Sequence, residues 1–164
     1  MVNVTPLHEA AVLWVAERMR AVDREEIFGM HGPEFGPAEL ARAAMESRYG
    51  GVAYVGDVPA AAFGAVEAWP GMFSLWLFAT DDWPRVAMNV HRHVVRRLFP
   101  VAWANGARRG EARSHERHTT AHKWLERLGA VREAVMPQHG MDGSTYYLYA
   151  WRRSDDVLWD SEGS

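Results

Sequence analysis

Three histidines close together in the sequence can do acid–base chemistry or bind a metal. His115 and His118 are predicted at a strand end and a helix start, and an imidazole exchanges its proton near neutral pH. Both can instead be partly exposed helix-entry residues. His118 and His122 lie one helical turn apart, as zinc ligands often do, but no acidic third ligand has suitable spacing. The chain also contains no cysteine, so no metal site is predicted.

Arginines form a second group of interest. They can make a patch for phosphate or an acidic partner, or simply the solvated face of a helix. His91 and His93 are two residues apart and point to different helix faces, so they are not a chelating pair. The net charge of -3 and the lack of a basic stripe argue against a nucleic-acid partner. The arginines in question are Arg92, Arg96, Arg97, Arg108 and Arg109.

The composition predicts one folded domain in residues 1–153, followed by an acidic, flexible tail in 154–164. With 48% hydrophobic residues and eight tryptophans, a disordered chain is excluded. No apolar run is long enough to span a membrane, and no secretory signal is recognisable. The predicted location is therefore the cytoplasm of a bacterial or phage-infected cell, with the virion as the alternative.

The segment 118–128 has the clearest local pattern, that of an amphipathic helix ending at a glycine. Trp124, Leu125 and Leu128 recur at spacings of three and four, and Gly129 stands where a left-handed cap residue belongs. A strand over 131–136 and a second strand over 145–151 should follow as a hairpin. In the second strand Tyr147, Tyr149 and Trp151 share one face by their period of two.

The rest of the chain predicts a strand over 2–4, three helices up to about residue 45, and three meander strands. The first helix should be capped at Thr5 with Pro6 in its first position, and should run to about Arg20. The meander strands are predicted over 52–55, 59–67 and 73–79. A helix over 84–99 and a strand over 109–113 complete the order. Gly64, inside the second meander strand, indicates a close approach or a bulge.

This order, and the "A-H-K-W-L-E-R-L-G-A" helix before a terminal hairpin, resemble the GCN5-related N-acetyltransferase (GNAT) superfamily. The resemblance covers residues 2 to about 152. It implies an α/β (α+β) fold with a central, mixed, mostly antiparallel sheet flanked by helices. Strands 73–79 and 109–113 should be parallel and splay apart near Ala79.

The resemblance also implies acetyl-CoA as the cofactor. Its pantetheine arm would pair with the end of the third meander strand, and its pyrophosphate with the start of the next helix and with Arg85. The chain departs from the family's glycine-rich loop, because it has no glycine between Gly71 and Gly106, and Asp81 and Asp82 add negative charge. We therefore expect weak binding, and the alternative is a capped core helix. The implied cofactor residues are Phe78, Ala79, Thr80, Arg85, Val86, Ala87, Met88 and Asn89.

The family's usual acid is a tyrosine four residues before the helix-ending glycine, and an asparagine stands seven residues earlier. Here these positions hold Leu125 and His118. We predict His118 and Tyr149 as replacement acids or bases and Glu67 as a general base. The alternatives are a helix-entry residue, a core tyrosine and a solvated strand end. Asp81 and Asp82 are further base candidates.

The resemblance thus implies an acetyl-CoA-dependent N-acetyltransferase that acts on an amine of a small molecule or a protein. The loop "A-T-D-D-W-P", together with the helix "H-x-x-A-x-x-W-L-x-x-L-G", is also similar to phage-encoded GNAT-like proteins of the internal virion type. The alternative function is therefore a catalytically degenerate protein of this fold with a binding or virion structural role. The expected partners of the chain are therefore a second copy of itself, in a homodimer, or other proteins of a virion.

Overall fold

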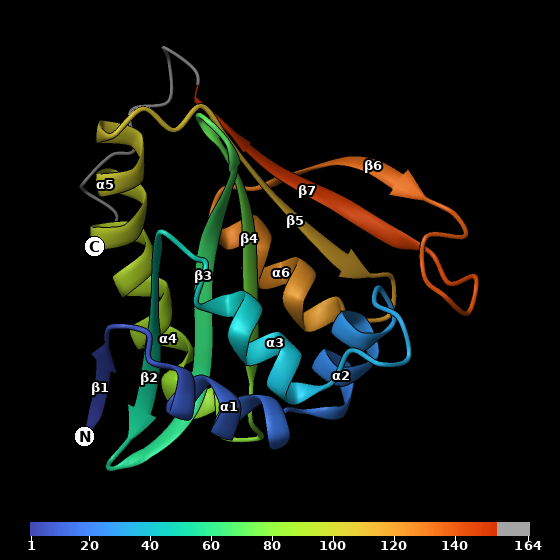
Figure 1. The fold of residues 1–164 in the computed structure, drawn as a ribbon. Helices are drawn as coiled ribbons and strands as arrows, with labels where there is room; N and C mark the ends of the chain where they lie inside the picture. Colours follow the sequence, from blue (N-terminus) through green and yellow to red (C-terminus); the bar gives the residue numbers. More distant parts are fainter. Residues whose placement is uncertain (154–164) are drawn as a thin grey trace.

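The computed structural model describes residues 1–153, so the predicted tail over 154–164 lies outside the described residues. A central seven-stranded sheet has the order β1-β2-β3-β4-β5-β7-β6 (Figure 1). Neighbouring strands are antiparallel except β4 and β5, which are parallel, so the predicted fold class is confirmed. The strands are β1 (Val2–Thr5), β2 (Tyr49–Val55), β3 (Val58–Trp69), β4 (Met72–Ala79), β5 (Arg109–His115), β6 (Val131–Met136) and β7 (Tyr146–Arg152).

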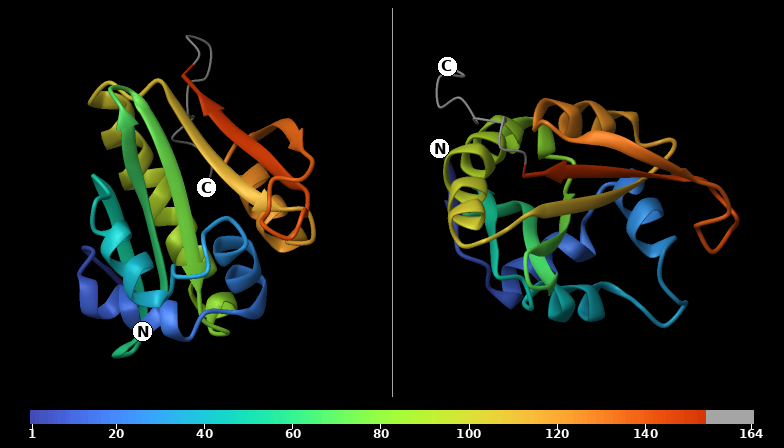
Figure 2. Two further views of the ribbon diagram at one scale, coloured as in Figure 1. Left: turned by 45° about the vertical axis from the view of Figure 1, so that its right-hand side comes forward. Right: turned by 90° about the horizontal axis from the view of Figure 1, so that it is seen from above.

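Helices cover both faces of the sheet (Figures 1 and 2). One face carries α1, α2 and α3, and the other carries the long α4–η1–α5 helix and α6. Each layer has its own apolar core: Val12 and Val15 pack with Phe78 on the first face, and Val86 and Val90 pack with Phe63 on the second. The helices are α1 (Glu9–Glu17), α2 (Ala21–Phe28), α3 (Pro37–Ala44), α4 (Trp83–His93), the π-helix η1 (Val94–Leu98), α5 (Phe99–Ala104) and α6 (Thr119–Arg127).

The parallel pair β4 and β5 opens like a V. The strands pair only where residues 72–74 of β4 meet residues 109–111 of β5, and then diverge. Figure 2 shows the gap widening toward the end of β4. The prediction of parallel, splayed strands is confirmed, but the splay begins after Ser74, five residues before the predicted Ala79. The cause is α2, which occupies the space beside the end of β4 and holds the strands apart.

Helix α6 ends as its sequence predicts. Gly129 has a φ of 90°, a conformation that costs a non-glycine residue steric strain. Leu125 and Leu128 are buried in the core, and Tyr149 and Trp151 of β7 lie in the same cluster with Tyr147 packed against it. The predicted shared face of the last strand is therefore confirmed.

Two helix boundaries differ from the prediction. Thr5 still belongs to β1, where it pairs with Val52, and α1 begins after His8, whose ring accepts a hydrogen bond from the Ala11 N–H. The helix after β4 continues past the predicted end to Ala104. A π turn, in which the Phe99 N–H bonds to the Val94 carbonyl, restarts the hydrogen-bond register just before Pro100. A proline is tolerated in such a first turn.

Candidate functional site

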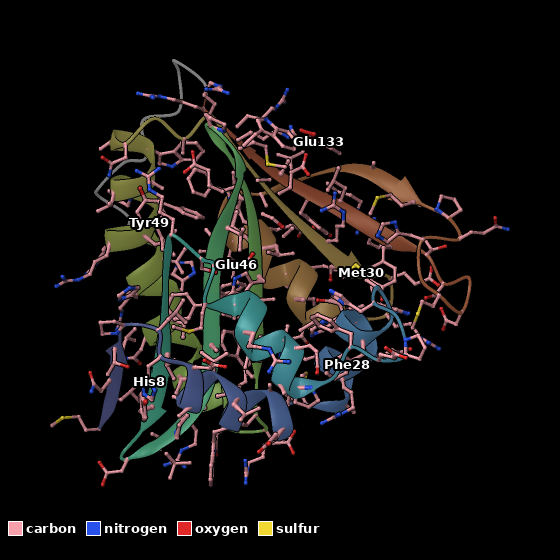
Figure 3. All side chains as sticks on the ribbon, viewed as in Figure 1. His8, Phe28, Met30, Glu46, Tyr49 and Glu133 are labelled. Carbon is pink, nitrogen blue, oxygen red and sulfur yellow. The ribbon has the colours of Figure 1, made fainter. Side chains whose placement is uncertain are left out.

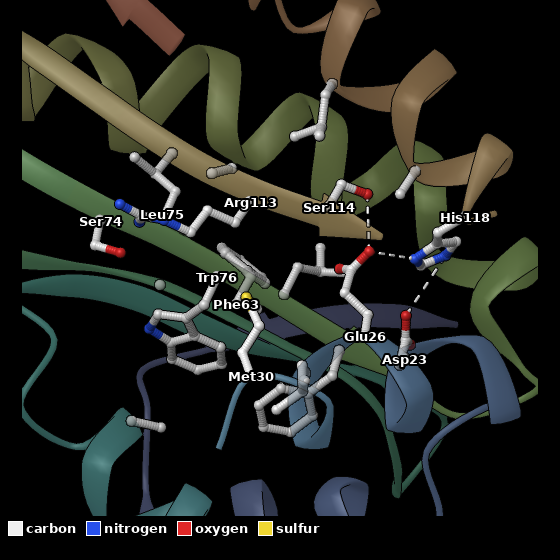
Figure 4. Close-up of a pocket in the computed structure, with 18 of the residues that line it drawn as sticks. Asp23, Glu26, Met30, Phe63, Ser74, Leu75, Trp76, Arg113, Ser114 and His118 are labelled. Carbon is white, nitrogen blue, oxygen red and sulfur yellow. Dashed lines mark hydrogen bonds and ion pairs between the residues drawn. The ribbon is translucent and has the colours of Figure 1, made fainter. Parts of the chain in front are cut away.

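A cavity of about 450 Å³ fills the V between β4 and β5. On the α2–α3 side its wall includes Met30, Phe35 and Trp76. On the α4–α6 side it includes Trp83 and Trp124. A ligand in this space would thus touch both layers of helices and both splayed strands. Figure 4 shows the polar side chains that point into it from α2, β5 and the start of α6.

The β4 strand exposes unpaired backbone groups to this cavity at Leu77. Thr80 donates its N–H to Ala60 of β3, so every second residue back along β4 also faces β3. The backbone N–H and C=O groups of the alternate residues, Ala79 and Leu77, therefore point away from β3 and into the V. Among residues 1–153 no hydrogen bond reaches the Leu77 backbone, because the pairing with β5 ends at Ser74. An extended ligand can pair there in place of a strand.

Ala79, the next residue on that edge, is already fully bonded to α2. Its N–H donates to Asp23 Oδ2 (2.9 Å), and its carbonyl accepts from the Arg20 N–H (2.8 Å). Asp23 is 1% exposed and also accepts two hydrogen bonds of 2.9 Å from Arg20. Burial raises the pKa of Asp23, and the charge of Arg20 and the Ala79 N–H oppose that shift. This arrangement fixes α2 against the open end of β4.

Glu26, one turn later in α2, gathers three donors on a single oxygen. Its Oε2 accepts from Ser114 Oγ (2.8 Å), the His115 N–H (2.9 Å) and His118 Nδ1 (3.0 Å) (Figure 4). Glu26 Oε1 takes part in none of the hydrogen bonds between the described residues, and Glu26 is one of the residues that line the cavity. One carboxylate oxygen therefore holds β5 and α6 in place while the other remains available.

His118 lies between the two carboxylates and has one unpaired nitrogen. Because an ionised carboxylate only accepts, His118 Nδ1 donates to Glu26, which leaves the Nε2 lone pair in the neutral ring. Nε2 is buried without a hydrogen-bond partner among the described residues and lies 3.6 Å from Asp23 Oδ1. A ring fixed by a carboxylate, with its second nitrogen unpaired in a cavity wall, is the arrangement of an oriented base.

The other two histidines of the group are structural neighbours of His118. His122 Nε2 donates to the His115 carbonyl (3.0 Å), and the His122 ring stacks on Tyr149. Burial lowers the pKa of His122, and the bond to His115 opposes that shift. His115 Nδ1 accepts from the Arg117 N–H. Within residues 1–153 no three His, Cys, Asp or Glu side chains converge as metal ligands would.

Of the three predicted catalytic residues, the structure brings only His118 to the cavity. Glu67 lies near the closed end of the V, where it bonds to Arg48 (2.6 Å) and to the Gly71 N–H. The hydrogen bond from Arg48 lowers the pKa of Glu67. Tyr149 is fully buried, and its hydroxyl accepts from Arg132 of β6. Glu67 and Tyr149 therefore do not reach the cavity. Glu67 lies on the part of β3 beside the closed end of the V, and Tyr149 lies on β7, which pairs with β6.

The predicted pantetheine contacts are also displaced. The backbone groups of Phe78 face β3, the Thr80 N–H bonds to Ala60 while its carbonyl accepts from Trp83, and the groups of Ala79 are bonded to Asp23 and Arg20. The strand atoms that can pair with an arm are those of Leu77, two residues before Ala79. Helix α2 covers the strand end that the sequence indicated.

The predicted pyrophosphate contacts at the start of α4 lack unpaired donors. The Trp83 N–H bonds to Thr80 and the Arg85 N–H to Asp82, while Pro84 has no N–H. The N–H groups of Ala87, Met88 and Asn89 lie inside the helix, where helical geometry pairs them with carbonyls four residues back. This helix start therefore offers few donors to a pyrophosphate. Met88 is 57% exposed and does not fill the V.

Two tryptophans meet on the α4–α6 side of the cavity. The rings of Trp83 and Trp124 contact edge to face with centroids 5.5 Å apart. Trp124 Nε1 is buried without a hydrogen-bond partner among residues 1–153. The two rings thus lie against each other in the part of the cavity wall that α4 and α6 provide.

The five arginines considered from the sequence do not form one patch. Arg92, Arg96 and Arg97 are exposed along α4 and η1. Arg109 instead makes ion pairs with Glu111 and with Glu133, which Figure 3 labels on β6 near the closed end of the V. Arg108 donates to the Pro70 carbonyl. The three helical arginines fit the solvated-face interpretation.

Asp23 and Glu26 are the functional candidates that the sequence interpretation missed. The available signal was their spacing of three on α2, which places both on the inward face with Ile27. Carboxylates on the apolar face of a short helix indicate a buried polar site.

No protein-family model matches the chain, and no curated protein is similar to it in sequence. Solved structures do share its fold. Ard1 from Thermoplasma volcanium has a TM-score of 0.70 and 13% identity, over 94% of this chain and 99% of that one. The ribosomal-protein-S18-alanine N-acetyltransferase from Escherichia coli has 0.67 and 14%, over 96% and 99%.

A third similar structure is yncA from Salmonella typhimurium, solved with its cofactor acetyl-CoA. It has a TM-score of 0.68 and 12% identity, over 98% of both chains. At such identities the comparisons establish the fold, that of the GNAT acetyltransferases. In the described part of the chain, no helix is long and apolar enough to cross a bilayer.

Proposed function

We propose that the protein is an acetyl-CoA-dependent N-acetyltransferase in which His118 is the base and Glu26 orients it. The observation that carries the proposal is His118, a residue of the wall of the cavity between β4 and β5, whose Nε2 is buried without a hydrogen-bond partner among the described residues and lies 3.6 Å from Asp23 Oδ1. The shared fold, and the acetyl-CoA in yncA, support the choice of donor. When bound, acetyl-CoA would supply the acetyl group as a thioester.

The chain's own residues would prepare the amine. A protonated amine cannot attack a carbonyl, so its proton must be removed, and His118 Nε2 would accept it. Glu26 Oε2 holds the ring in the tautomer that leaves Nε2 unprotonated, and stabilises the charged ring that follows. The Leu77 backbone would hold the arm of the donor in extended form. Trp83 and Trp124 would exclude water from the opposite side.

The donor should be held by its arm and only weakly by its phosphates. This follows from the α4 start, where the Trp83 and Arg85 N–H groups are already bonded, Pro84 has no N–H, and the Arg85 side chain is paired with Asp82. Calorimetric titrations should therefore give affinities for acetyl-CoA and for S-acetyl-pantetheine within about tenfold of each other. Arg85→Glu should weaken acetyl-CoA binding and leave S-acetyl-pantetheine binding unchanged.

Thiol release from acetyl-CoA, with a panel of primary amines, tests the chemistry. His118→Gln should lower kcat on the order of 100-fold or more while the far-UV circular dichroism stays unchanged. His91→Gln, on the α4 surface, is the matched control and should retain full activity. Full activity in His118→Gln would refute the assigned base.

A second candidate is a catalytically inactive protein of the same fold with a binding or virion structural role. The closed α4 start and the Trp83–Trp124 contact favour it. Thermal denaturation with acetyl-CoA distinguishes the two, because a ligand at 100 times its dissociation constant adds roughly 2.7 kcal/mol of stability. No stabilisation at millimolar acetyl-CoA would select the second function.

A further inference from the structure

The α2–α3 side of the cavity joins a single acidic end to rigid aromatic walls. We propose that it binds a primary amine that carries an apolar, aromatic-sized side group, with the nitrogen at Glu26 and His118. The proposal names the acceptor class and rests on the transfer reaction proposed above. Free arylalkylamines and peptides with an aromatic first residue share this chemistry.

The end of the cavity at Glu26 and Asp23 favours one positive charge in a ligand. We call the α2–α3 side of the cavity, from these carboxylates to Trp76 and Phe35, the chamber. Asp23 and Glu26 are the only carboxylates among the described residues that line the cavity. Arg20 neutralises Asp23 through two hydrogen bonds, whereas Glu26 has no guanidinium partner within residues 1–153. The hydrogen bonds of that part of the chain do not use Glu26 Oε1, so an ammonium group can donate to it. A charge-assisted bond of this kind is among the stronger hydrogen bonds in proteins.

The outer part of the chamber is apolar because its aromatic rings have their polar atoms engaged elsewhere. Trp76 Nε1 donates to Ser47 Oγ (2.7 Å), and its ring lies on Gly64, where a Cβ would come within 2.7 Å of the ring. Gly64 therefore permits a close approach, one of the two options its sequence indicated. Trp76 also stacks on Phe78 with centroids 5.2 Å apart. The Trp76 ring is thereby held as a flat wall (Figure 4).

The opposite wall comes from the loop that follows α2, on which Figure 3 labels Met30. His31 stacks on Phe35 with centroids 4.0 Å apart, and its Nδ1 donates to the Ile27 carbonyl (2.7 Å). His31, Phe35 and Met30 all line the cavity. An aromatic group between such walls gains stacking and burial without ordering mobile side chains.

Away from Glu26 and Asp23 the cavity offers no carboxylate to a second cation among the described residues. Arg113, His31 and His139 also line it, and none of them carries negative charge. A diamine would bring its far ammonium group toward the Arg113 guanidinium and lose affinity. The chamber should therefore discriminate against polyamines and lysine-like side chains.

Binding to the full-length protein, measured by calorimetry without any acyl donor, tests this proposal. 2-Phenylethylamine should bind at least about tenfold more tightly than 1,4-diaminobutane. Trp76→Ala should weaken 2-phenylethylamine about tenfold, and Glu26→Gln should also weaken it. The exposed Trp69→Ala is the matched control and should bind like the wild type. Gly64→Ala, which displaces the Trp76 ring, replaces Trp76→Ala if that variant does not fold.

Equal or tighter binding of the diamine, or unchanged affinity in both Trp76→Ala and Gly64→Ala, would overturn the proposal. A dipeptide amide with N-terminal phenylalanine, used as a second ligand, shows whether the acceptor amine belongs to a peptide or to a free small molecule. Tighter binding than 2-phenylethylamine indicates a protein N-terminus, and weaker binding indicates a free amine. The binding experiment contains no acyl donor, so it tests the acceptor class independently of the reaction. If the protein binds amines selectively here but transfers no acetyl group in the thiol-release assay, the proposed reaction is refuted and the proposed acceptor class is retained.

Discussion

Two arginine–aspartate pairs with the same i,i+3 spacing stand near the end of β4, one at the start of α2 and one at the start of α4. In the Arg20–Asp23 pair of α2 the closest atoms are 2.8 Å apart and the side chains are 14% and 1% exposed. In the Arg85–Asp82 pair of α4 they are 3.5 Å apart and the side chains are 63% and 46% exposed. The same residue types at the same spacing thus form a structural anchor in one helix and a solvated surface pair in the other.

The difference shows that burial, and not residue type, decides what such a pair does. A buried carboxylate without its partner is strongly unfavourable, so Arg20, Asp23 and Ala79 must stay together. An exposed pair exchanges its contacts with water and contributes little. Charge in the loop before α4 is therefore available for other uses, whereas charge in α2 is committed to the fold.

Removing Asp23 should have the largest effect. Asp23→Ala leaves Arg20 without its partner and the Ala79 N–H without its acceptor, so the free energy of unfolding should fall by about 3–5 kcal/mol. Thermal denaturation should show a Tm lower by roughly 10 °C. Asp82→Ala is the matched control and should change stability by less than about 1 kcal/mol. Equal losses in the two variants would refute the comparison.

A smaller loss is expected at the second buried carboxylate. Glu26→Gln keeps the shape but replaces charge-assisted bonds to His118, Ser114 and the His115 N–H with neutral ones. Urea unfolding should therefore show a loss of about 1–3 kcal/mol. Glu25, the residue before Glu26, lies on the more exposed face of α2. The variant Glu25→Gln should therefore lose less than about 1 kcal/mol of unfolding free energy. If Glu25→Gln were the more destabilised variant, α2 would not be anchored through its inward face.

The smallest effect should be a change in pH dependence at His122. Burial lowers the pKa of His122 below its usual 6.5, so on acidification the unfolded chain takes up the proton before the folded one. The stability that His122 contributes above that pH is lost as the pH falls further. His122→Gln should therefore lose less Tm than the wild type between about pH 7.5 and about pH 5. His139→Gln, an exposed control, should follow the wild-type slope, and a steeper slope in His122→Gln would contradict the prediction.

The sequence predicted the fold well where the signal was local. The pattern before Gly129 is a matter of periodicity and backbone sterics within one helix, and the observed helix end and φ agree with it. The meander strands and their order followed from alternation and turn residues. The site was less predictable, because Asp23 and Glu26 are 56 and 88 residues from the groups at Ala79 and Ser114 to which they bond.

The positions of Glu67 and Tyr149, away from the cavity, have the same origin. Each residue type was suitable for its proposed role, and each lies on a strand of the sheet near the V. The strand register decided the outcome: Glu67 pairs opposite Phe73 at the closed end, and Tyr149 pairs with Arg132 on the far side of β5. No pattern within either strand reports the distance to a gap between two other strands.

By itself the sequence determined the elements, their order and the glycine that ends α6, because these depend on propensity, periodicity and backbone sterics over a few residues. It also determined that no cysteine chemistry occurs. Only the tertiary structure decided that β4 and β5 part after Ser74, that α2 enters the opening, and that Glu26 fixes His118 beside a cavity. Those features depend on the burial of charge and on contacts between distant segments, and both exist only once the layers have packed.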